Sequence, residues 1–457
     1  MTALPDGLLA AWYGDDFTGA AATMEVFAFA GLDAVLFVDV PTPEQIARFA
    51  DARGIGIAGV SRSHSPQWMR RELPKVYQAL AGLKAPFNFY KVCSTFDSAP
   101  DVGSIGCAVE LALDHFQSDW MPMLVAAPDI GRWQVFGHLF AAGPGGNYRL
   151  DRHPVMARHP VTPMVESDLC RHLAAQTDLP SGLVSIRDLA VDGQGALGRV
   201  QQEARIVSLD AVDETSLAAA GALIWENRAT GRFGIGSQGV LYALIAYWRA
   251  QGLLEAEPAV PSAGHTDRLV VVSGSASVVT AAQIDWALDN GFAGVRFDAA
   301  AVLGTAGSAE AEDQAVTEAL QALERGMQPL IFAAKGPDDP AIAAFEAAAC
   351  AAGMPLEDAR GRIGAALGRV LRRLLEQTDC RRAIISGGDT SGHATQQLGI
   401  YALKALAPTI PAAALCRAFS ENPRFDGLEL ALKGGQMGAT DYFGAVRAGG
   451  GTQQEDQ

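Results

Sequence analysis

Short apolar runs alternate with stretches of helical periodicity through the first half of the chain. The first run, residues 8–13, leads through a turn into a helical pattern that continues to residue 30. Strands are predicted in the same way at 34–38, 55–60, 87–92, 124–127, 182–186 and 206–209, and helices at 42–52 and 68–83. Strands that alternate with helices predict a parallel, doubly wound sheet.

A second alternating series follows a stretch rich in proline, glycine and small polar residues. We therefore interpret residues 255–267 as a linker between a domain at 1–254 and a domain at 268–448. The second series predicts strands at 268–273, 295–297, 328–333 and 383–386, and helices at 281–289, 313–325, 341–352 and 361–378. The expected fold class is α/β, with two doubly wound domains, mostly parallel sheets and an active site in the inter-domain cleft. Residues 449–457 are expected to be disordered.

The composition limits the kinds of partner. Hydrophobic residues make up 49% of the chain and charged residues 19%, which is typical of a globular protein with a substantial core. A net charge of −16 disfavours general nucleic-acid binding, because a phosphate backbone requires a basic surface. The six cysteines form no C-x-x-C pair, and the chain shows neither a leader pattern nor an apolar run of about 20 residues. We expect a cytoplasmic protein without a membrane partner, and a homodimer on base rates.

Glycine-rich turns near the C-terminus indicate a phosphate site. Residues 386–392 read Ser-Gly-Gly-Asp-Thr-Ser-Gly after an apolar strand and before a helix. Glycines let the backbone approach an anion, and the helix N-terminus supplies N–H groups with positive partial charge. Residues 432–438 form a second glycine turn, and a Ser-Gly-Ser-Ala-Ser turn at 273–277 is a weaker signal of the same kind. Together they predict a site for a nucleotide and its phosphates.

Acidic residues stand at the first strand-to-helix turn, Gly-Asp-Asp-Phe-Thr-Gly at 14–19. Ligands of open α/β sheets bind at the carboxyl ends of strands, where Asp15 and Asp16 could orient hydroxyl groups or accept a proton. Alternatively, Asp16 or Thr18 caps the helix.

The fourth predicted strand ends in a second polar cluster. Lys91 and the sequence Cys-Ser-Thr-Phe-Asp-Ser at 93–98 follow an apolar run. The ammonium group, the hydroxyls of Ser94 and Thr95 and the carboxylate of Asp97 could bind a polyhydroxy acid, although a polar loop would look similar. Cys93 lacks an evident histidine partner and is interpreted as an inert thiol.

Two His-Pro steps lie in residues 152–164, together with two arginines. The prolines prevent the regular helical spacing that a histidine pair would need to bind a metal. We favour a loop that contacts substrate through Arg158 and His159, with an extended structural connector as the alternative.

Residues 54–59, Gly-Ile-Gly-Ile-Ala-Gly, match the dinucleotide pattern by letter only. Their glycines alternate with apolar residues and form the predicted strand itself, and no helix start follows. This context argues against an NAD-dependent dehydrogenase, and no P-loop sequence is present.

Taken together, these motifs resemble the four-carbon acid sugar kinase family over nearly the whole chain. The resemblance rests on the elements at 14–20, 273–277, 386–390 and 433–438. It implies an N-terminal domain that binds an acid sugar and a C-terminal domain that binds ATP. The residues implied to contact the nucleotide are Ser277, Gly387, Gly388, Asp389, Thr390, Gly434 and Gly435.

The same resemblance implies roles in the first domain. Asp15 is the favoured catalytic base, with Asp97 second, and Arg62 and Arg158 would hold the substrate carboxylate. Asp16, Thr18, Lys91, Ser94, Thr95 and His159 would also face the substrate. Mg²⁺ would accompany the phosphates of ATP, and no residue is assigned as its ligand.

The segment at 91–98 is similar to the form found in the 3-oxo-acid branch of the family rather than in its threonate and erythronate branches. The sequence Gly-Ser-Ile-Gly at 103–106 differs from the form usual in 3-oxo-tetronate kinases. This difference leaves room for a larger or branched substrate such as 3-oxo-isoapionate. The alternatives are a threonate or erythronate kinase and, in other classes, a dehydrogenase or a non-catalytic sugar-acid-binding protein.

Overall fold

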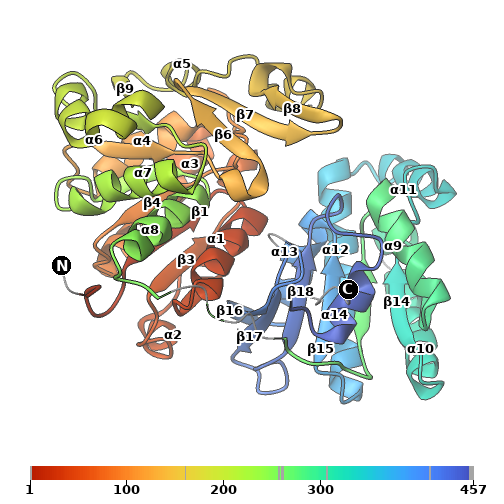
Figure 1. The fold of residues 1–457 in the computed structure, drawn as a ribbon. Helices are drawn as coiled ribbons and strands as arrows, with labels where there is room; N and C mark the ends of the chain where they lie inside the picture. The colour runs from red at the N-terminus through yellow and green to blue at the C-terminus, as the bar shows by residue number, and fades with distance from the viewer. Residues whose placement is uncertain are drawn as a thin grey trace. The chain divides into compact units, whose positions relative to one another are not determined.

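The computed structural model describes residues 3–159, 161–255, 258, 262–304, 307–410 and 413–451, without the side chains of Glu357 and Asp389. The chain divides into two compact units, Met1–Pro258 and Ala259–Gln457, which we call the N-terminal and C-terminal units (Figure 1). Much of the predicted linker, at 256, 257 and 259–261, lies outside the described residues, as does the predicted tail from 452 onward.

A parallel sheet forms the centre of the N-terminal unit. Its strands run in the spatial order β2-β3-β1-β4-β11-β5-β10-β9. Their bounds are β1 Ala10–Gly14, β2 Ala34–Phe37, β3 Gly54–Ala58, β4 Asn88–Lys91, β5 Met121–Leu124, β9 Ser181–Val184, β10 Ile206–Leu209 and β11 Phe233–Gly236. Every pairing in this sheet is parallel, as the alternation of strands and helices predicts.

Helices cover both faces of this sheet. Helices α3 (Pro66–Gly82) and α4 (Ile105–Leu113) pack with Ala11 and Tyr13 of β1 in one hydrophobic core. Trp12 points to the opposite face, where it contacts Phe27 of α1 (Phe17–Phe29), and Phe27 contacts Trp248 of α8 (Gly239–Ala250). The remaining helices of this unit are α2 Pro43–Ala47, α5 Leu169–Ala174, α6 Ile186–Val200 and α7 Glu214–Glu226.

A small antiparallel sheet was not predicted. It consists of β6 (Arg132–Val135), β7 (His138–Gly143) and β8 (Gly146–Arg149), which are labelled together near α5 in Figure 1. These strands are short and contain many polar and half-buried residues, so they lack the continuous apolar runs by which the buried parallel strands were recognised.

The C-terminal unit has a mixed sheet with the strand order β13-β14-β12-β15-β18-β17-β16. The strands are β12 Val270–Ser273, β13 Phe292–Arg296, β14 Gln328–Phe332, β15 Arg382–Ser386, β16 Ile400–Ala407, β17 Leu415–Ser420 and β18 Glu429–Lys433. Pairings from β13 to β18 are parallel, whereas β17 is antiparallel to both β18 and β16. The helices are α9 Val278–Asp289, α10 Gly307–Glu324, α11 Pro340–Ala351, α12 Leu356–Gln377, α13 Gly388–Gln397 and α14 Tyr442–Ala448.

In the described part of the chain, no helix is long and apolar enough to cross a membrane. No disulfide joins the six cysteines in the described part of the chain.

Close packing explains the glycines of strand β3. A Cβ atom built on Gly56 would overlap the indole ring of Trp12, which is fully buried on the neighbouring strand. Gly54 is similarly close to Phe27 and Trp12. The glycines therefore make room for aromatic side chains, and the prediction that residues 54–59 are part of a strand rather than a dinucleotide loop agrees with the observed β3.

We expect Gly56→Ala to destabilise the N-terminal unit by about 1–3 kcal/mol, because an added methyl group must displace the packed Trp12 ring. Urea unfolding monitored by tryptophan fluorescence measures this change. Gly82→Ala is the matched control, since Gly82 ends helix α3 with open space around it. Equal stability of the two variants would contradict the packing role.

Candidate functional site

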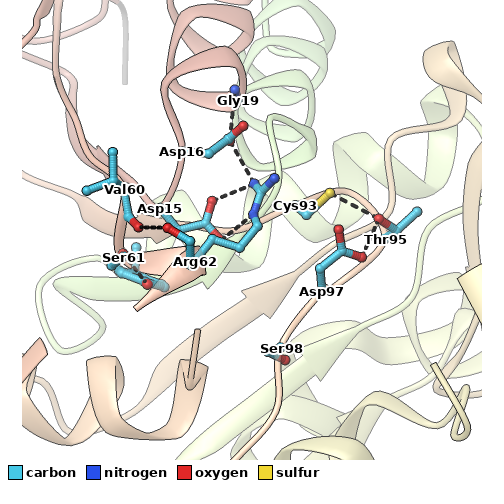
Figure 2. Close-up of polar contacts among 12 residues, drawn as sticks. Asp15, Asp16, Gly19, Val60, Ser61, Arg62, Cys93, Thr95, Asp97 and Ser98 are labelled. Atoms are coloured by element: carbon cyan, nitrogen blue, oxygen red, sulfur yellow. Dashed lines mark hydrogen bonds and ion pairs between the residues drawn. The ribbon is translucent and has the colours of Figure 1, made fainter. Parts of the chain in front are cut away.

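The carboxyl edge of the N-terminal sheet gathers charged residues from separate parts of the chain. Asp15 and Asp16 follow β1, Arg62 lies in a short turn after β3, and Lys91 ends β4. Because β3, β1 and β4 are adjacent parallel strands, their ends meet at one edge. Figure 2 shows Asp15, Asp16 and Arg62 converging there.

Arg62 joins the two aspartates. Its Nε donates to Asp15 Oδ2 at 3.2 Å, and its Nη2 donates to Asp15 Oδ1 and to Asp16 Oδ1, each at 2.7 Å (Figure 2). The edge of the guanidinium formed by Nε and Nη2 is therefore occupied by protein carboxylates. Nη1 makes no hydrogen bond to the described residues and is the part of Arg62 left for a ligand.

The two aspartates differ in their surroundings. The Asp15 side chain is 2% exposed, and burial raises its pKa even though Arg62 opposes the shift. Asp16 is 29% exposed; burial would raise its pKa, but Arg62 and Lys91 together lower it. Asp16 also caps helix α1, since its carboxylate accepts the Gly19 N–H at 2.9 Å. Asp16 is therefore the N-cap of α1, and Asp15 has no capping role.

Lys91 is a buried cation that, together with Arg62, lowers the pKa of Asp16. It is 2% exposed, and no hydrogen bond or ion pair to the described residues reaches its Nζ. Its ammonium group lies against Gly19, where a Cβ atom would collide with Nζ and with Asp16 Oδ1. Burial of an unpaired ammonium group is costly, so this arrangement favours a site that receives an anion or hydroxyl oxygens.

The segment after β4 is ordered by its own side chains. Thr95 Oγ1 donates to Asp97 Oδ1 at 2.8 Å and lies 3.0 Å from Cys93 Sγ (Figure 2). Burial and Asp97 raise the pKa of the Cys93 thiol, which disfavours a reactive thiolate. Thr95 and Asp97 are buried and Ser94 is half-buried.

The other predicted residues of this unit lie less centrally. Thr18 is half-buried in the first turn of α1. Arg158 is exposed, and no contact with the Asp15 cluster is recorded for it. His159 Nδ1 accepts the Thr162 N–H at 3.0 Å, so it helps to shape its own loop.

The first His-Pro step has a structural role. His153 is 6% exposed, its Nδ1 accepts the N–H groups of Val155 and Met156 at 3.2 Å, and its Nε2 lies 3.3 Å from Ala142 O. It therefore fastens the loop to strand β7.

One basic residue near Cys93 and Asp97, Arg132, was not predicted from the sequence. Arg132 begins β6, and both Cys93 and Asp97 act on it electrostatically. No motif surrounds it in the sequence, and the small sheet that carries it was not predicted.

The glycine turns of the C-terminal unit meet in a pocket of about 330 Å³. Its lining includes backbone-rich turns, contributed by Gly274, Ser275, Gly387, Gly388, Thr390 and Gly435. The lining also includes apolar residues, Ala299, Ala333, Ala334, Ile342, Phe345 and Ile363, together with the charged Glu346. A pocket lined both by apolar side chains and by turns with N–H groups suits a planar base joined to phosphates.

Two glycines of the Ser-Gly-Gly-Asp-Thr turn shape this pocket. Gly387 has φ +127°, and a Cβ atom there would lie 2.8 Å from Thr390 Oγ1. Gly388 begins helix α13 and faces open space. Asp389 belongs to the same helix turn, but its side chain lies outside the described part of the structure.

The other two turns support one another. Ser277 caps α9 through the Thr280 N–H at 3.0 Å, and its hydroxyl donates to Gly435 O. Lys433 Nζ donates to Thr280 Oγ1 at 3.2 Å and to Gly434 O at 3.0 Å, and burial lowers its pKa to about 8. Gly435 lines the pocket, whereas Ser277 and Gly434 are not among its lining residues.

The apolar lining of the pocket was missed by sequence reasoning. Its residues come from α11, α12 and the ends of other elements, where they look like ordinary core positions. Arg360 of α12 also lines the pocket.

Among the described residues, no group of three or more His, Cys, Asp or Glu side chains could hold a metal ion.

Two family models match successive parts of the chain. Residues 10–244 match the model of a sugar-binding N-terminal domain, and residues 270–443 match that of a nucleotide-binding C-terminal domain. The chain is 48% identical over 452 residues to a 3-oxo-isoapionate kinase of Paraburkholderia graminis, with 98% of this chain and 96% of the relative covered. It is 31% identical to a 3-oxo-tetronate kinase of Pseudomonas savastanoi pv. phaseolicola, with 94% of each covered.

A solved structure also resembles this fold. A protein from Salmonella typhimurium LT2 superposes with a TM-score of 0.77 at 26% identity, covering 98% of this chain and 99% of that one. With both domain models matched in order and 48% identity along nearly its whole length, the chain belongs to the four-carbon acid sugar kinase family.

Proposed function

We propose that this protein transfers the γ-phosphoryl group of ATP to the terminal hydroxyl of a 3-oxo sugar acid, with 3-oxo-isoapionate as the favoured substrate. The main observation behind the proposal is the pocket of about 330 Å³, which is lined by the glycine turns and by apolar side chains. The 48% identical 3-oxo-isoapionate kinase supports the choice of acid.

In this proposal the C-terminal unit holds ATP. The adenine ring lies against the apolar side chains of Phe345 and Ile363, and the phosphates face the turn at Gly387 and Gly388 and the N-terminus of α13. Thr390 and Gly435 also line the pocket. Mg²⁺, carried by the phosphates, would neutralise the charge that develops during transfer.

Asp15 is the proposed base. Its raised pKa suits a carboxylate that must accept a proton from an alcohol, and Lys91 and the free Nη1 group of Arg62 can hold substrate oxygens nearby. The hydroxyl oxygen forms a bond to the γ-phosphorus as the bond from that phosphorus to the ADP oxygen breaks, and the hydroxyl proton passes to Asp15.

Several features of the proposal remain predictions. Asp97 is the second candidate base and, with Thr95, is placed to bind a substrate hydroxyl. A homodimer and a cytoplasmic location are expected from the sequence alone. Threonate and erythronate are the alternative acceptors.

A coupled assay of ADP release tests the reaction. We expect the wild-type protein to show its highest kcat/KM with 3-oxo-isoapionate or a 3-oxo-tetronate, and lower values with threonates and erythronates. Activity confined to the acids without an oxo group would contradict the proposed substrate class. Absence of acid-dependent ADP release throughout the panel would contradict the kinase proposal.

Asp15→Asn should lower kcat by about 10²–10⁴-fold while leaving KM for ATP within a factor of two or so, because the amide cannot accept the proton. Circular dichroism and the melting temperature check that the variant is folded. Asp101→Asn, at an exposed position in the loop after β4, serves as the control. An unchanged kcat in Asp15→Asn removes Asp15 from the proton transfer.

Gly387→Ala should raise the Kd for ATP by about tenfold or more, because a side chain at this φ is strained by about 1–3 kcal/mol and contacts Thr390. Calorimetric titration with an ATP analogue and Mg²⁺ measures the effect. Gly392→Ala, in the same helix with open space around it, should bind as the wild type does. Equal affinities in the two variants would show that this turn does not hold the nucleotide.

A further inference from the structure

Arg132 occupies a position equivalent to the proposed substrate residues of the other strands. It follows the short turn Pro128–Ile130 and Gly131 after strand β5, at the carboxyl edge of the N-terminal sheet. Along that edge the strand order β3-β1-β4-β11-β5 places Arg62 after the first strand, Asp15 after the second, Lys91 at the third and Arg132 after the last.

The Arg132 guanidinium is held from one side by the backbone. Its Nη1 donates to Gly131 O at 2.9 Å and Ile130 O at 3.2 Å, with Ala142 O at 3.5 Å. Ala142 O is also the oxygen that His153 approaches from the neighbouring loop. The direction of the planar group is therefore fixed by the turn and by strand β7.

The other side of this guanidinium has no partner. Nε is buried and makes no hydrogen bond, and no hydrogen bond or ion pair of Nη2 to the described residues is recorded. Nε and Nη2 form the edge through which arginine binds a carboxylate with two parallel hydrogen bonds. A buried N–H group left without an acceptor carries a cost, so an unpaired Nε is best explained by an acceptor that arrives with a ligand.

The charges around Arg132 are consistent with an incoming anion. Burial lowers its pKa, and the opposing influences come from Cys93, whose thiol is disfavoured as a thiolate, and from Asp97. Asp97 is hydrogen-bonded by Thr95 and forms no ion pair with Arg132 within contact distance. The electrostatic influence of Asp97 on Arg132 places both side chains in one neighbourhood, where Asp97 could accept a hydrogen bond from a substrate hydroxyl.

The corresponding edge of Arg62 is already used. Its Nε and Nη2 bind Asp15 and Asp16, so the bidentate carboxylate site first expected at Arg62 is filled by protein groups. Arg158, the other arginine expected to hold the carboxylate, is exposed on its loop.

We propose, on the basis of the function proposed above, that Arg132 binds the carboxylate of the sugar acid through its Nε–Nη2 edge and so determines selectivity for acids over neutral sugars. The hydroxyl that receives the phosphoryl group then lies toward Asp15 and Lys91. Lys91 ends β4, whereas Arg132 stands at the start of β6, beyond the turn that follows β5. Both cations act electrostatically on Cys93, so both charges lie near the loop after β4.

Calorimetric titration without ATP tests this orientation with 3-oxo-isoapionate and its carboxamide as a matched neutral probe. The wild-type protein should prefer the acid by about tenfold or more, and Arg132→Gln should weaken acid binding by about 10–100-fold with little change for the amide. Arg132→Lys should give an intermediate loss, because it keeps the charge without the two-pronged geometry. In turnover, KM for the acid should rise far more than kcat falls.

The controls separate recognition from structural damage. Arg149→Gln, an exposed position in the same small sheet, should keep the wild-type preference for the acid. A parallel loss of acid and amide affinity in Arg132→Gln, or an acid-specific loss in Arg158→Gln instead, would overturn the assignment. If the acid binds in a way that depends on Arg132 but is not phosphorylated, the proposed function is contradicted and the role of Arg132 is not. If the acid is phosphorylated and Arg132→Gln keeps the wild-type preference for the acid, the role of Arg132 is contradicted and the proposed function is not. A wild-type protein that neither binds nor phosphorylates the acid would overturn both.

Discussion

Parallel pairing brings the carboxyl ends of neighbouring strands to a single edge of each sheet, and the candidate sites of both units depend on that constraint. In the N-terminal unit it aligns Asp15, Arg62 and Lys91 although they are far apart in sequence. In the C-terminal unit it aligns the turns after β12, β15 and β18, since Ser273 pairs with Ser386 and Ser386 with Lys433.

Glycines convert this alignment into close contact. Gly19 admits the Lys91 ammonium group beside the start of α1, Gly387 admits the Thr390 hydroxyl, and Gly435 admits Ser275. A methyl group at any of these positions would meet a polar atom that the site requires. The glycine content of the motifs therefore reflects packing of functional groups as well as backbone freedom.

The sequence predicted those parts of the fold and sites that carry a local signal. The apolar runs predicted the parallel strands, and Asp15, Asp16 and Lys91 were recognised because they directly follow such runs. Arg132 was missed because β6 is short and half-buried and its environment is created by contacts with residues 130, 131 and 142. The apolar lining of the pocket in the C-terminal unit was missed because a residue such as Phe345 gives the same sequence signal in a pocket wall as in a core.

The burial of the Lys91 ammonium group has a thermodynamic consequence. Folding, rather than ligand binding, removes most of the water from this cation, so most of its dehydration precedes the arrival of any anion. When an anion binds, its favourable electrostatic contact with Lys91 is gained with little further reorganisation of water or protein, as in a preorganised site. The same arrangement makes the empty protein less stable than an apolar residue at position 91 would, which is a trade-off between conformational stability and activity.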